Sequence, residues 1–244
     1  MVPDAVEQLV KGREWSRVVV LTGAGLSAAS GIPTFRGAGG YYQGRDAASL
    51  ASPEGFESDP VLVWNWYAMR IRAVLAAEPN TGHIALTDLA SNGSAIILTS
   101  NVDDLHDRSG HSPVRIHGNI LETKCTVTDD VSAVNIENWP EIFEFETLPR
   151  SVEGNLSRPN VVWFGERPWG RAFEIVESLD GTELFLEVGT SGVVSYGFTE
   201  YAARMGCGVV RINPDSGRDR NIVNWRESSE VALPKLVDLL VNES

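Results

Sequence analysis

The chain has 244 residues, of which 43% are hydrophobic and 22% charged, and its formal net charge at pH 7 is −13. This size predicts one large α/β domain with a small insertion. The acidic balance argues against nucleic-acid partners, because phosphate contacts need Lys and Arg, and no apolar run is long enough to span a membrane. Cys125 and Cys207 are too few for a disulfide framework. The N-terminus lacks a signal-type pattern, so we expect a cytoplasmic protein without membrane partners.

Residues 1–17 predict a short amphipathic helix, and short apolar runs then alternate with helical segments along the chain. Such runs are typical of strands buried on both faces of a parallel sheet. Each run ends in polar or glycine-rich residues, and the carboxyl ends of parallel strands form the ligand crevice of doubly wound folds. We therefore expect these polar ends to meet. The predicted strands are 18–21, 95–99, 114–117, 183–188 and 209–212.

Two segments do not fit this sheet. Residues 38–75 begin glycine-rich and become helical, and residues 122–160 are polar and acidic. The predicted fold is therefore α/β: a Rossmann-like, doubly wound parallel sheet with a smaller inserted lobe. We assign residues 1–37, 76–121 and 161–244 to the Rossmann-like domain, which the helix predicted at 230–243 closes, and residues 38–75 and 122–160 to the lobe.

A glycine turn follows the first predicted strand, at Gly23, Ala24 and Gly25. Backbone N–H groups at the start of a helix favour phosphate. In an ordinary dinucleotide-binding fold, a second strand and an acidic residue follow about 20 residues later. Here that position falls in the glycine-rich loop with no strand before it. The pattern therefore disfavours a standard dehydrogenase.

Polar residues also cluster after the strand at 95–99, in TSNVDDLH, residues 99–106. Capping of a helix by Ser100 or Asn101 would explain one or two of them, with the acids favouring the helix N-terminus. His117 ends the next predicted strand, and Gly118 after it predicts a close backbone approach. A lone histidine is more often structural, but its place among the other strand ends favours a role in a site.

Six short segments occur in order along the chain: GAGLSAASGIPTFRG, TSNVDDLH, IHGN, RPNVVWFGE, GTSG and RINPD. In that order they resemble the sirtuin family of NAD-dependent protein deacylases, over about residues 15 to 215. The resemblance implies NAD as co-substrate, acyl-lysine proteins or peptides as substrates, and nicotinamide and O-acyl-ADP-ribose as products.

The resemblance also implies which residues bind NAD. The glycine turn would cradle the pyrophosphate, Arg36 would add a phosphate contact, and Phe35 would cover the reacting ribose. Asn213 would contact the adenosine ribose. The implied cofactor-binding set is Gly23, Ala24, Gly25, Ser27, Phe35, Arg36, Ser100, Asn101, Asp103, Gly189, Thr190, Ser191 and Asn213.

The catalytic residues that the resemblance implies are His117, Asn101 and Asp103. Asp103 would grip the nicotinamide carboxamide, and Asn101 would hold the ribose hydroxyls and a water. His117 would act as general base on a ribose hydroxyl. The substrate peptide would pair as an added strand with the backbone of a later segment. That segment contains Val161, Val162, Phe164, Gly165 and Glu166.

The chain departs from the family pattern at two places. Ser100 stands where the family usually has Gln, which shortens a ribose contact. The family also carries two CxxC pairs that bind structural zinc, whereas this chain keeps Cys125, has Thr128 at the partner position and has no cysteine in 148–157. We therefore expect no zinc and no other metal. The lobe would instead be held by packing of Trp139, Ile142, Phe143 and Phe145.

Tyr67 and Arg70 reproduce a spacing found in sirtuins that remove acidic acyl groups such as succinyl. Residues i and i+3 share a helix face, so a phenol and a guanidinium could clamp a carboxylate together. The alternative is an ordinary amphipathic helix in which Arg70 reaches solvent. The preferred function is a desuccinylase and deacetylase. The alternatives are an NAD-dependent ADP-ribosyltransferase or NAD hydrolase and a non-enzymatic NAD-binding module, and the oligomeric state stays open.

Overall fold

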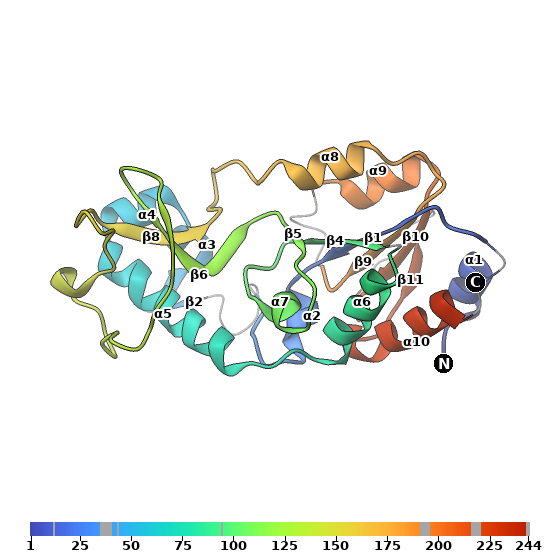
Figure 1. The fold of residues 1–244 in the computed structure, drawn as a ribbon, viewed down its shortest axis with the longest axis horizontal. Coiled ribbons are helices and arrows are strands. Elements are labelled where there is room, and N and C mark those ends of the chain that lie inside the picture. Colours follow the sequence, from blue (N-terminus) through green and yellow to red (C-terminus); the bar gives the residue numbers. More distant parts are fainter. Residues whose placement is uncertain are drawn as a thin grey trace.

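A large unit built on a parallel sheet lies beside a smaller lobe built on an antiparallel sheet (Figure 1). This computed structural model describes residues 1–11, 13–34, 41–42, 44–93, 95–190, 196–215 and 221–242. The predicted α/β fold with an added lobe is confirmed. The two termini lie near each other at the end of the large unit that faces away from the lobe (Figure 1).

The parallel sheet has six strands in the described part of the chain, in the order β11-β10-β9-β1-β4-β5. Thr22, the last residue of β1, lies opposite Thr99 on one side and Val188 on the other. The strand ends therefore form one row, where the polar residues that follow them meet. The strands are β1 Val18–Thr22, β4 Ala95–Thr99, β5 Val114–Arg115, β9 Leu184–Val188, β10 Gly208–Ile212 and β11 Val223–Trp225.

Two differences from the expected strands have physical reasons. The strand predicted at 114–117 ends at Arg115. Gly118 has a positive φ of 85°, and it turns the chain out of the parallel sheet into the lobe. The edge strand β11 was not predicted, because it has three residues and its pairing with β10, not an apolar run, defines it.

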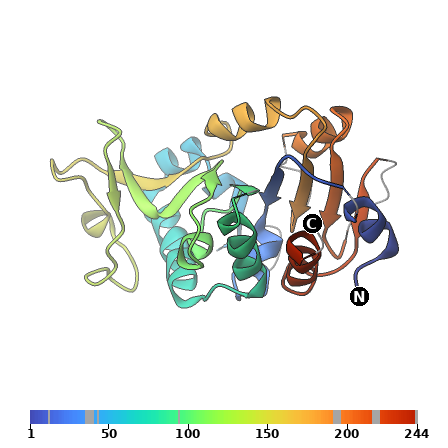
Figure 2. The same cartoon turned by 45° about the vertical axis from the view of Figure 1, so that its right-hand side comes forward.

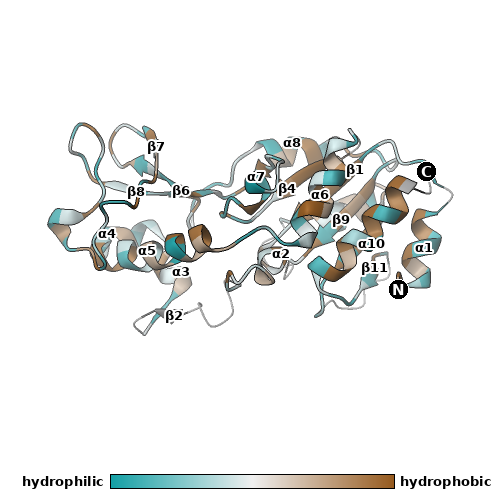
Figure 3. Cartoon of the chain, turned by 60° about the horizontal axis from the view of Figure 1, so that its bottom comes forward, coloured by the Kyte–Doolittle hydropathy of each residue, from teal (hydrophilic) through white to brown (hydrophobic). Residues whose placement is uncertain are grey.

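Helices cover both faces of this sheet. Val18 and Val20 pack in one hydrophobic cluster with α6 and α10, whereas Val19 and Leu21 pack in another with α8 and α9. This alternation explains why β1 is apolar at every position but the last. The helices α6 and α10 mix hydrophobic and hydrophilic residues (Figure 3), as expected for one buried side. The helices are α1 Asp4–Val10, α6 Thr81–Ser91, α8 Arg171–Glu177, α9 Phe198–Arg204 and α10 Ser229–Asn242.

The lobe contains a three-stranded antiparallel sheet with β6 in the middle, packed beside the long helix α5. Figure 2 shows this sheet at the left and the parallel sheet at the right. The lobe sheet begins at Gly118, earlier than the predicted boundary at 122. The elements are β2 Tyr41–Tyr42, β3 Arg45–Asp46, α3 Ala47–Leu50, α4 Pro53–Ser58, α5 Pro60–Ala76, β6 Gly118–Cys125, β7 Val131–Ala133, the 3₁₀ helix η1 Phe145–Thr147 and β8 Ser157–Val161.

Aromatic side chains fill the core of the lobe. Trp64 of α5 packs against Trp139 and Phe143, with ring centroids 5.8 and 6.1 Å away. The expectation that Ile142 and Phe145 join this core is wrong, since they are 70% and 53% exposed. Trp139 and Phe143 already occupy the space beside Trp64 of α5, so the side chains of Ile142 and Phe145 point outward.

No helix in the described ranges is both long enough and apolar enough to cross a bilayer.

Candidate active site

The glycine turn after β1 packs directly against the turn after β9. A Cβ added at Gly25 would lie 2.7 Å from the Cα of Gly189. The amide of Gly23 donates to Val188 O at 2.9 Å, and that of Gly25 donates to Gly189 O at 2.8 Å. The glycines therefore permit close approach of two strand ends and the start of α2, Ala24–Ala28. Contact of this turn with a pyrophosphate stays a prediction.

Three polar side chains expected in the site form a buried hydrogen-bonded group. The amide nitrogen of Asn101 donates to Gly23 O at 3.1 Å and to the hydroxyl oxygen of Ser27 at 3.2 Å. The Ser27 hydroxyl in turn donates to Asp103 Oδ2 at 2.9 Å. Each of the three residues is at most 6% exposed. The structure thus brings together residues from the turns after β1 and β4.

Neither Ser100 nor Asn101 caps the helix that follows β4, so the alternative explanation of these residues by capping is wrong. This helix, α7, spans Leu105–Arg108, and the amide of Leu105 donates to Asp103 Oδ1 at 3.2 Å. The Ser100 hydroxyl instead donates to Thr22 O at 3.0 Å. Because α7 begins later than the pattern suggested, Ser100 and Asn101 are left to connect β4 with β1.

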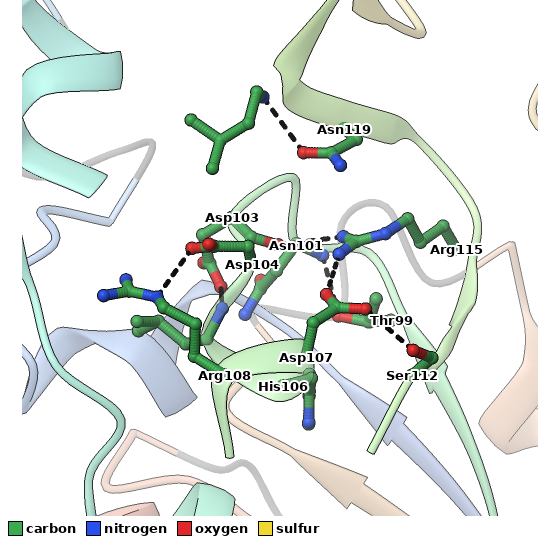
Figure 4. A network of polar contacts seen from close by, with 12 residues as sticks. Thr99, Asn101, Asp103, Asp104, His106, Asp107, Arg108, Ser112, Arg115 and Asn119 are labelled. Atoms are coloured by element: carbon green, nitrogen blue, oxygen red, sulfur yellow. Dashed lines mark hydrogen bonds and ion pairs between the residues drawn. The ribbon is translucent and has the colours of Figure 1, made fainter. Parts of the chain in front are cut away.

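Cationic side chains hold the Asp103 segment in place (Figure 4). Arg115 donates to the backbone oxygen of Asp103 at 2.8 Å and forms an ion pair with Asp107. Arg108 donates to Asp104 and to the carbonyl oxygens at the end of α5. Burial raises the pKa of the Asp103 carboxyl, while the hydrogen bonds from Ser27 and Leu105 act in the opposite direction.

His117 lies at the same edge and makes one hydrogen bond through each ring nitrogen. Its Nδ1 lies 2.9 Å from Ser100 O, a pure acceptor, so Nδ1 carries the proton. Its Nε2 therefore accepts, and the phenol of Tyr196 donates to it at 2.7 Å. Burial lowers the pKa of His117, and the hydrogen bond to Ser100 only partly offsets this. The imidazole is thus held neutral, as a general base requires.

Sequence reasoning missed Tyr196. The residue is 41% exposed and has a φ of +52°, which is unusual for a bulky side chain. Its ring packs against Phe173 and Phe198, with centroids 5.2 and 5.8 Å away. No local pattern in the sequence connects Tyr196 with His117, because only the tertiary fold brings the two together.

The expected nucleotide-groove residues after β9 and β10 lie side by side. The side-chain amide of Asn213 donates to the backbone oxygen of Thr190. The Thr190 hydroxyl donates to Glu187, which also pairs with Arg211 at 2.6 Å. Gly189 meets the glycine turn, as described above. The predicted residues Phe35, Arg36 and Ser191 lie outside the described residues.

The predicted peptide segment connects the lobe with this edge. Its strand β8 pairs with β6 on one side and is an edge strand in the described lobe sheet. The amide of Val162 donates to His117 O at 2.8 Å, and that of Phe164 donates to Ala51 O at 2.9 Å. The Glu166 carboxylate accepts from the Trp163 amide at 2.8 Å, within this segment. Gly165 has a φ of +89° and open space where a Cβ would stand.

Tyr67 and Arg70 lie together on α5, beside this segment. Tyr67 is 1% exposed, and its phenol oxygen accepts from the indole N–H of Trp163 at 2.9 Å. Arg70 lies over the Tyr67 side chain, with its guanidinium carbon 5.5 Å from the phenol ring centroid. Its guanidinium carbon lies 4.7 Å from the ring centroid of Trp66. Burial lowers the pKa of Arg70, and the Tyr67 phenol and then the Asp103 carboxylate oppose that shift.

A pair of buried histidines lies behind the strand ends and was not predicted. His106 Nε2 lies 3.1 Å from the hydroxyl of Thr22, and the rings of His83 and His106 are 5.2 Å apart. Burial lowers the pKa of His83 to about 4 and that of His106 to about 3. Both residues are therefore neutral at pH 7.

Within the described ranges, no group of three or more His, Cys, Asp and Glu side chains is arranged to hold a metal ion. Cys125 is 1% exposed. Hydrogen bonds from the Thr128 side chain, then from the amides of Thr128 and Val127, lower the pKa of its thiol to about 7. Ser151 acts in the same direction.

The sequence pattern of the Sir2 family matches residues 23–196. An NAD-dependent protein deacylase of Methylococcus capsulatus is 40% identical over 248 residues, covering 96% of each chain. One from Thermococcus kodakarensis is 46% identical over 186 residues, covering 72% of this chain and 70% of that protein. A crystal structure of a Sir2 homologue in complex with NAD is 34% identical, with a TM-score of 0.85 over 99% of this chain and 94% of that one.

The fold and the site between the parallel sheet and the lobe are those of Sir2 proteins. The chain belongs to the Sir2 family. Its activity is that of an NAD-dependent protein deacylase.

Proposed function

We propose that this deacylase acts on acyl-lysine side chains of proteins or peptides and favours acyl groups that end in a carboxylate, such as succinyl. NAD would supply the ribosyl group that the acyl oxygen captures as nicotinamide leaves. A related structure supports a peptide substrate. A Sir2 protein bound to a propionylated peptide is 25% identical, with a TM-score of 0.77 over 95% of each chain.

The hydrogen bonds of Tyr67 carry the acyl preference. Its phenol oxygen accepts from the Trp163 indole N–H, so the hydroxyl hydrogen points away from Trp163 and is the part that Tyr67 can offer to a ligand. Arg70 can only donate. A buried site that presents a hydroxyl donor and a guanidinium favours an anionic oxygen acceptor. A carboxylate at this place would also offset the desolvation that lowers the pKa of Arg70.

The contacts of the catalytic residues support the roles that we propose for them. The Nε2 of His117 is the base that takes a ribose hydroxyl proton once the Tyr196 phenol gives way to substrate. Asn101 and Asp103 are held by Gly23 and Ser27, in a geometry that can present an amide and a carboxylate to NAD. Ser100 connects two strands through its hydroxyl and orients His117 through its carbonyl, so the shorter side chain keeps a supporting role.

The test compares matched peptides bearing acetyl-lysine or succinyl-lysine, with NAD and product detection by mass spectrometry. We expect O-acyl-ADP-ribose only with peptide, and its loss in His117→Ala. In Arg70→Met the ratio of succinyl to acetyl kcat/KM should fall roughly 10- to 100-fold, the scale of a hydrogen bond to a charged group.

The matched control is Arg72→Met on the same helix. Arg72 donates to the carbonyls of Pro140 and Glu141 in the lobe, so its loss should leave the ratio unchanged. An unchanged ratio in Arg70→Met would refute the acidic-acyl preference. Free ADP-ribose without peptide, or ADP-ribose attached to protein, would favour the hydrolase or the transferase.

We also propose that the lobe folds without zinc. The positions around Cys125 are taken by Thr128 and Ser151, whose hydroxyls are poor zinc ligands next to thiolates, and the aromatic core supplies packing. Purified protein should contain far less than one zinc ion per chain by elemental analysis, because a structural zinc site binds its metal stoichiometrically. Its melting temperature should not change with a chelator. Stoichiometric zinc, or melting at lower temperature after chelation, would refute this proposal.

A further inference from the structure

Trp163 connects the predicted peptide segment with the acyl clamp on α5. Its indole N–H donates to the Tyr67 phenol oxygen at 2.9 Å, and the two residues are 3% and 1% exposed. Hydrogen bonds between buried groups are geometrically specific, because no water can replace a lost partner. The indole thus fixes one of the acceptor positions of the phenol.

The indole is itself held from several directions. The Arg158 guanidinium carbon lies 3.5 Å from its ring centroid, and Arg158 pairs with both carboxylate oxygens of Glu166 at 2.5 and 2.9 Å. Glu166 also accepts from the backbone amide of Trp163 at 2.8 Å. Phe56 of α4 packs against the indole, with ring centroids 5.3 Å apart. The position of the N–H donor is therefore set before any ligand binds.

The donor beside Tyr67 gives this arrangement a consequence for specificity. Because the Trp163 indole donates to the phenol oxygen, the hydroxyl hydrogen points away from the indole, while the Arg70 guanidinium carbon lies 5.5 Å from the phenol ring centroid. Without the indole N–H, the phenol oxygen has a vacant acceptor position, and the hydroxyl can turn. Tyr67 then no longer favours a ligand, such as a carboxylate, that can only accept a hydrogen bond.

We infer that Trp163 is a positioning residue for acyl specificity, and that its N–H orients the Tyr67 hydroxyl toward the carboxylate of an acidic acyl group. This inference rests on the proposed acidic-acyl preference. Trp163 acts through Tyr67 and needs no contact with the reacting atoms.

The test is Trp163→Phe, which keeps an aromatic ring for Arg158 and Phe56 but removes the N–H donor. The ratio of succinyl to acetyl kcat/KM should fall roughly three- to tenfold, the worth of one neutral hydrogen bond. The fall should lie mainly in KM for the succinyl peptide. Tyr67→Phe should lower the same ratio, and the double variant should add little to it, because both changes remove one shared interaction.

The matched control is Trp139→Phe, the same substitution in the same aromatic core. Trp139 packs edge-on against Trp64 and lies outside the clamp, so the ratio should stay at the wild-type value. Melting temperatures of all variants report any general loss of stability.

The outcomes separate this inference from the proposed function. If Arg70→Met lowers the ratio and Trp163→Phe does not, the acidic-acyl preference stands and the role of Trp163 is refuted. If acetyl and succinyl rates fall equally in Trp163→Phe, the residue is structural, which also refutes the inference. If neither Arg70→Met nor Tyr67→Phe changes the ratio, both the clamp and the inference fail.

Discussion

At the scale of single residues, the hydrogen-bond partners of His117 determine which of its ring nitrogens donates and which accepts. Ser100 O can only accept, so Nδ1 of His117 donates and Nε2 is left as the base. The Tyr196 phenol donates to that nitrogen. Since this bond stabilises the neutral imidazole, Tyr196 should keep the His117 pKa low, in addition to the effect of burial.

We therefore expect the acidic limb of the kcat/KM profile against pH to lie below the ordinary histidine pKa of 6.5. In Tyr196→Phe the neutral form loses its hydrogen bond, so the His117 pKa rises and the limb should move to higher pH. Tyr201→Phe on α9 is the control and should leave the limb in place. A wild-type limb above pH 6.5, or no movement in Tyr196→Phe, would contradict this assignment.

At the scale of elements, one glycine joins the two sheets. Gly118 begins β6 directly after His117, and it pairs with Val161 at the end of β8. A Cβ at this position would lie 2.2 Å from the backbone oxygen of Asn160. The chain can therefore pass from β5 into the lobe only without a side chain here, and that passage places His117 between the sheet and the lobe.

Gly118→Ala should destabilise the protein by more than about 2 kcal/mol, because positive φ and a backbone clash both oppose it. Chemical denaturation measures this loss. Gly93→Ala is a close control, since Gly93 has a φ of +83° but no atom within 4 Å of a built Cβ. It should cost only the conformational part, about 1 to 2 kcal/mol. Equal losses in the two variants would mean that the contact with Asn160 relaxes freely.

At the scale of the whole molecule, folding keeps His83 and His106 neutral in the core. Their folded-state pKa values, about 4 and about 3, lie below the unfolded value of 6.5. Between pH 6.5 and about 4 the unfolded chain takes up protons that the native protein does not. The free energy of unfolding must therefore decrease as the pH is lowered through that window.

We expect each buried histidine to account for about 2 kcal/mol of the stability lost between pH 7 and pH 5. At pH 7 the free energy of unfolding of His106→Gln should be lower than that of wild type. Between pH 7 and pH 5 it should decrease by about 2 kcal/mol less than that of wild type. Denaturant titrations at the two pH values measure the difference. The partly exposed His111, changed to Gln, should keep the wild-type loss. The same loss in His106→Gln as in wild type would show that this histidine is not held neutral.

The sequence predicted those parts of the protein that depend on local pattern. Apolar runs such as 18–21 require burial on both faces, so they predict a parallel sheet, and polar residues after them predict one shared edge. Asn101, Asp103 and His117 do meet there. The amphipathic pattern also predicted the terminal helices α1 and α10. These features follow from the periodicity of apolar residues and from local composition, which do not depend on contacts between distant segments.

Tertiary structure alone decided which side chains meet across the fold. Ile142 and Phe145 have the same apolar chemistry as Phe143, yet only Phe143 finds space against α5. Tyr196 reaches His117, and Trp163 reaches Tyr67, over separations at which no sequence period exists. The strand β11 is a strand because β10 offers an edge. The sequence by itself therefore determined the fold class and the catalytic edge, whereas packing across distant segments decided which partners orient the catalytic groups.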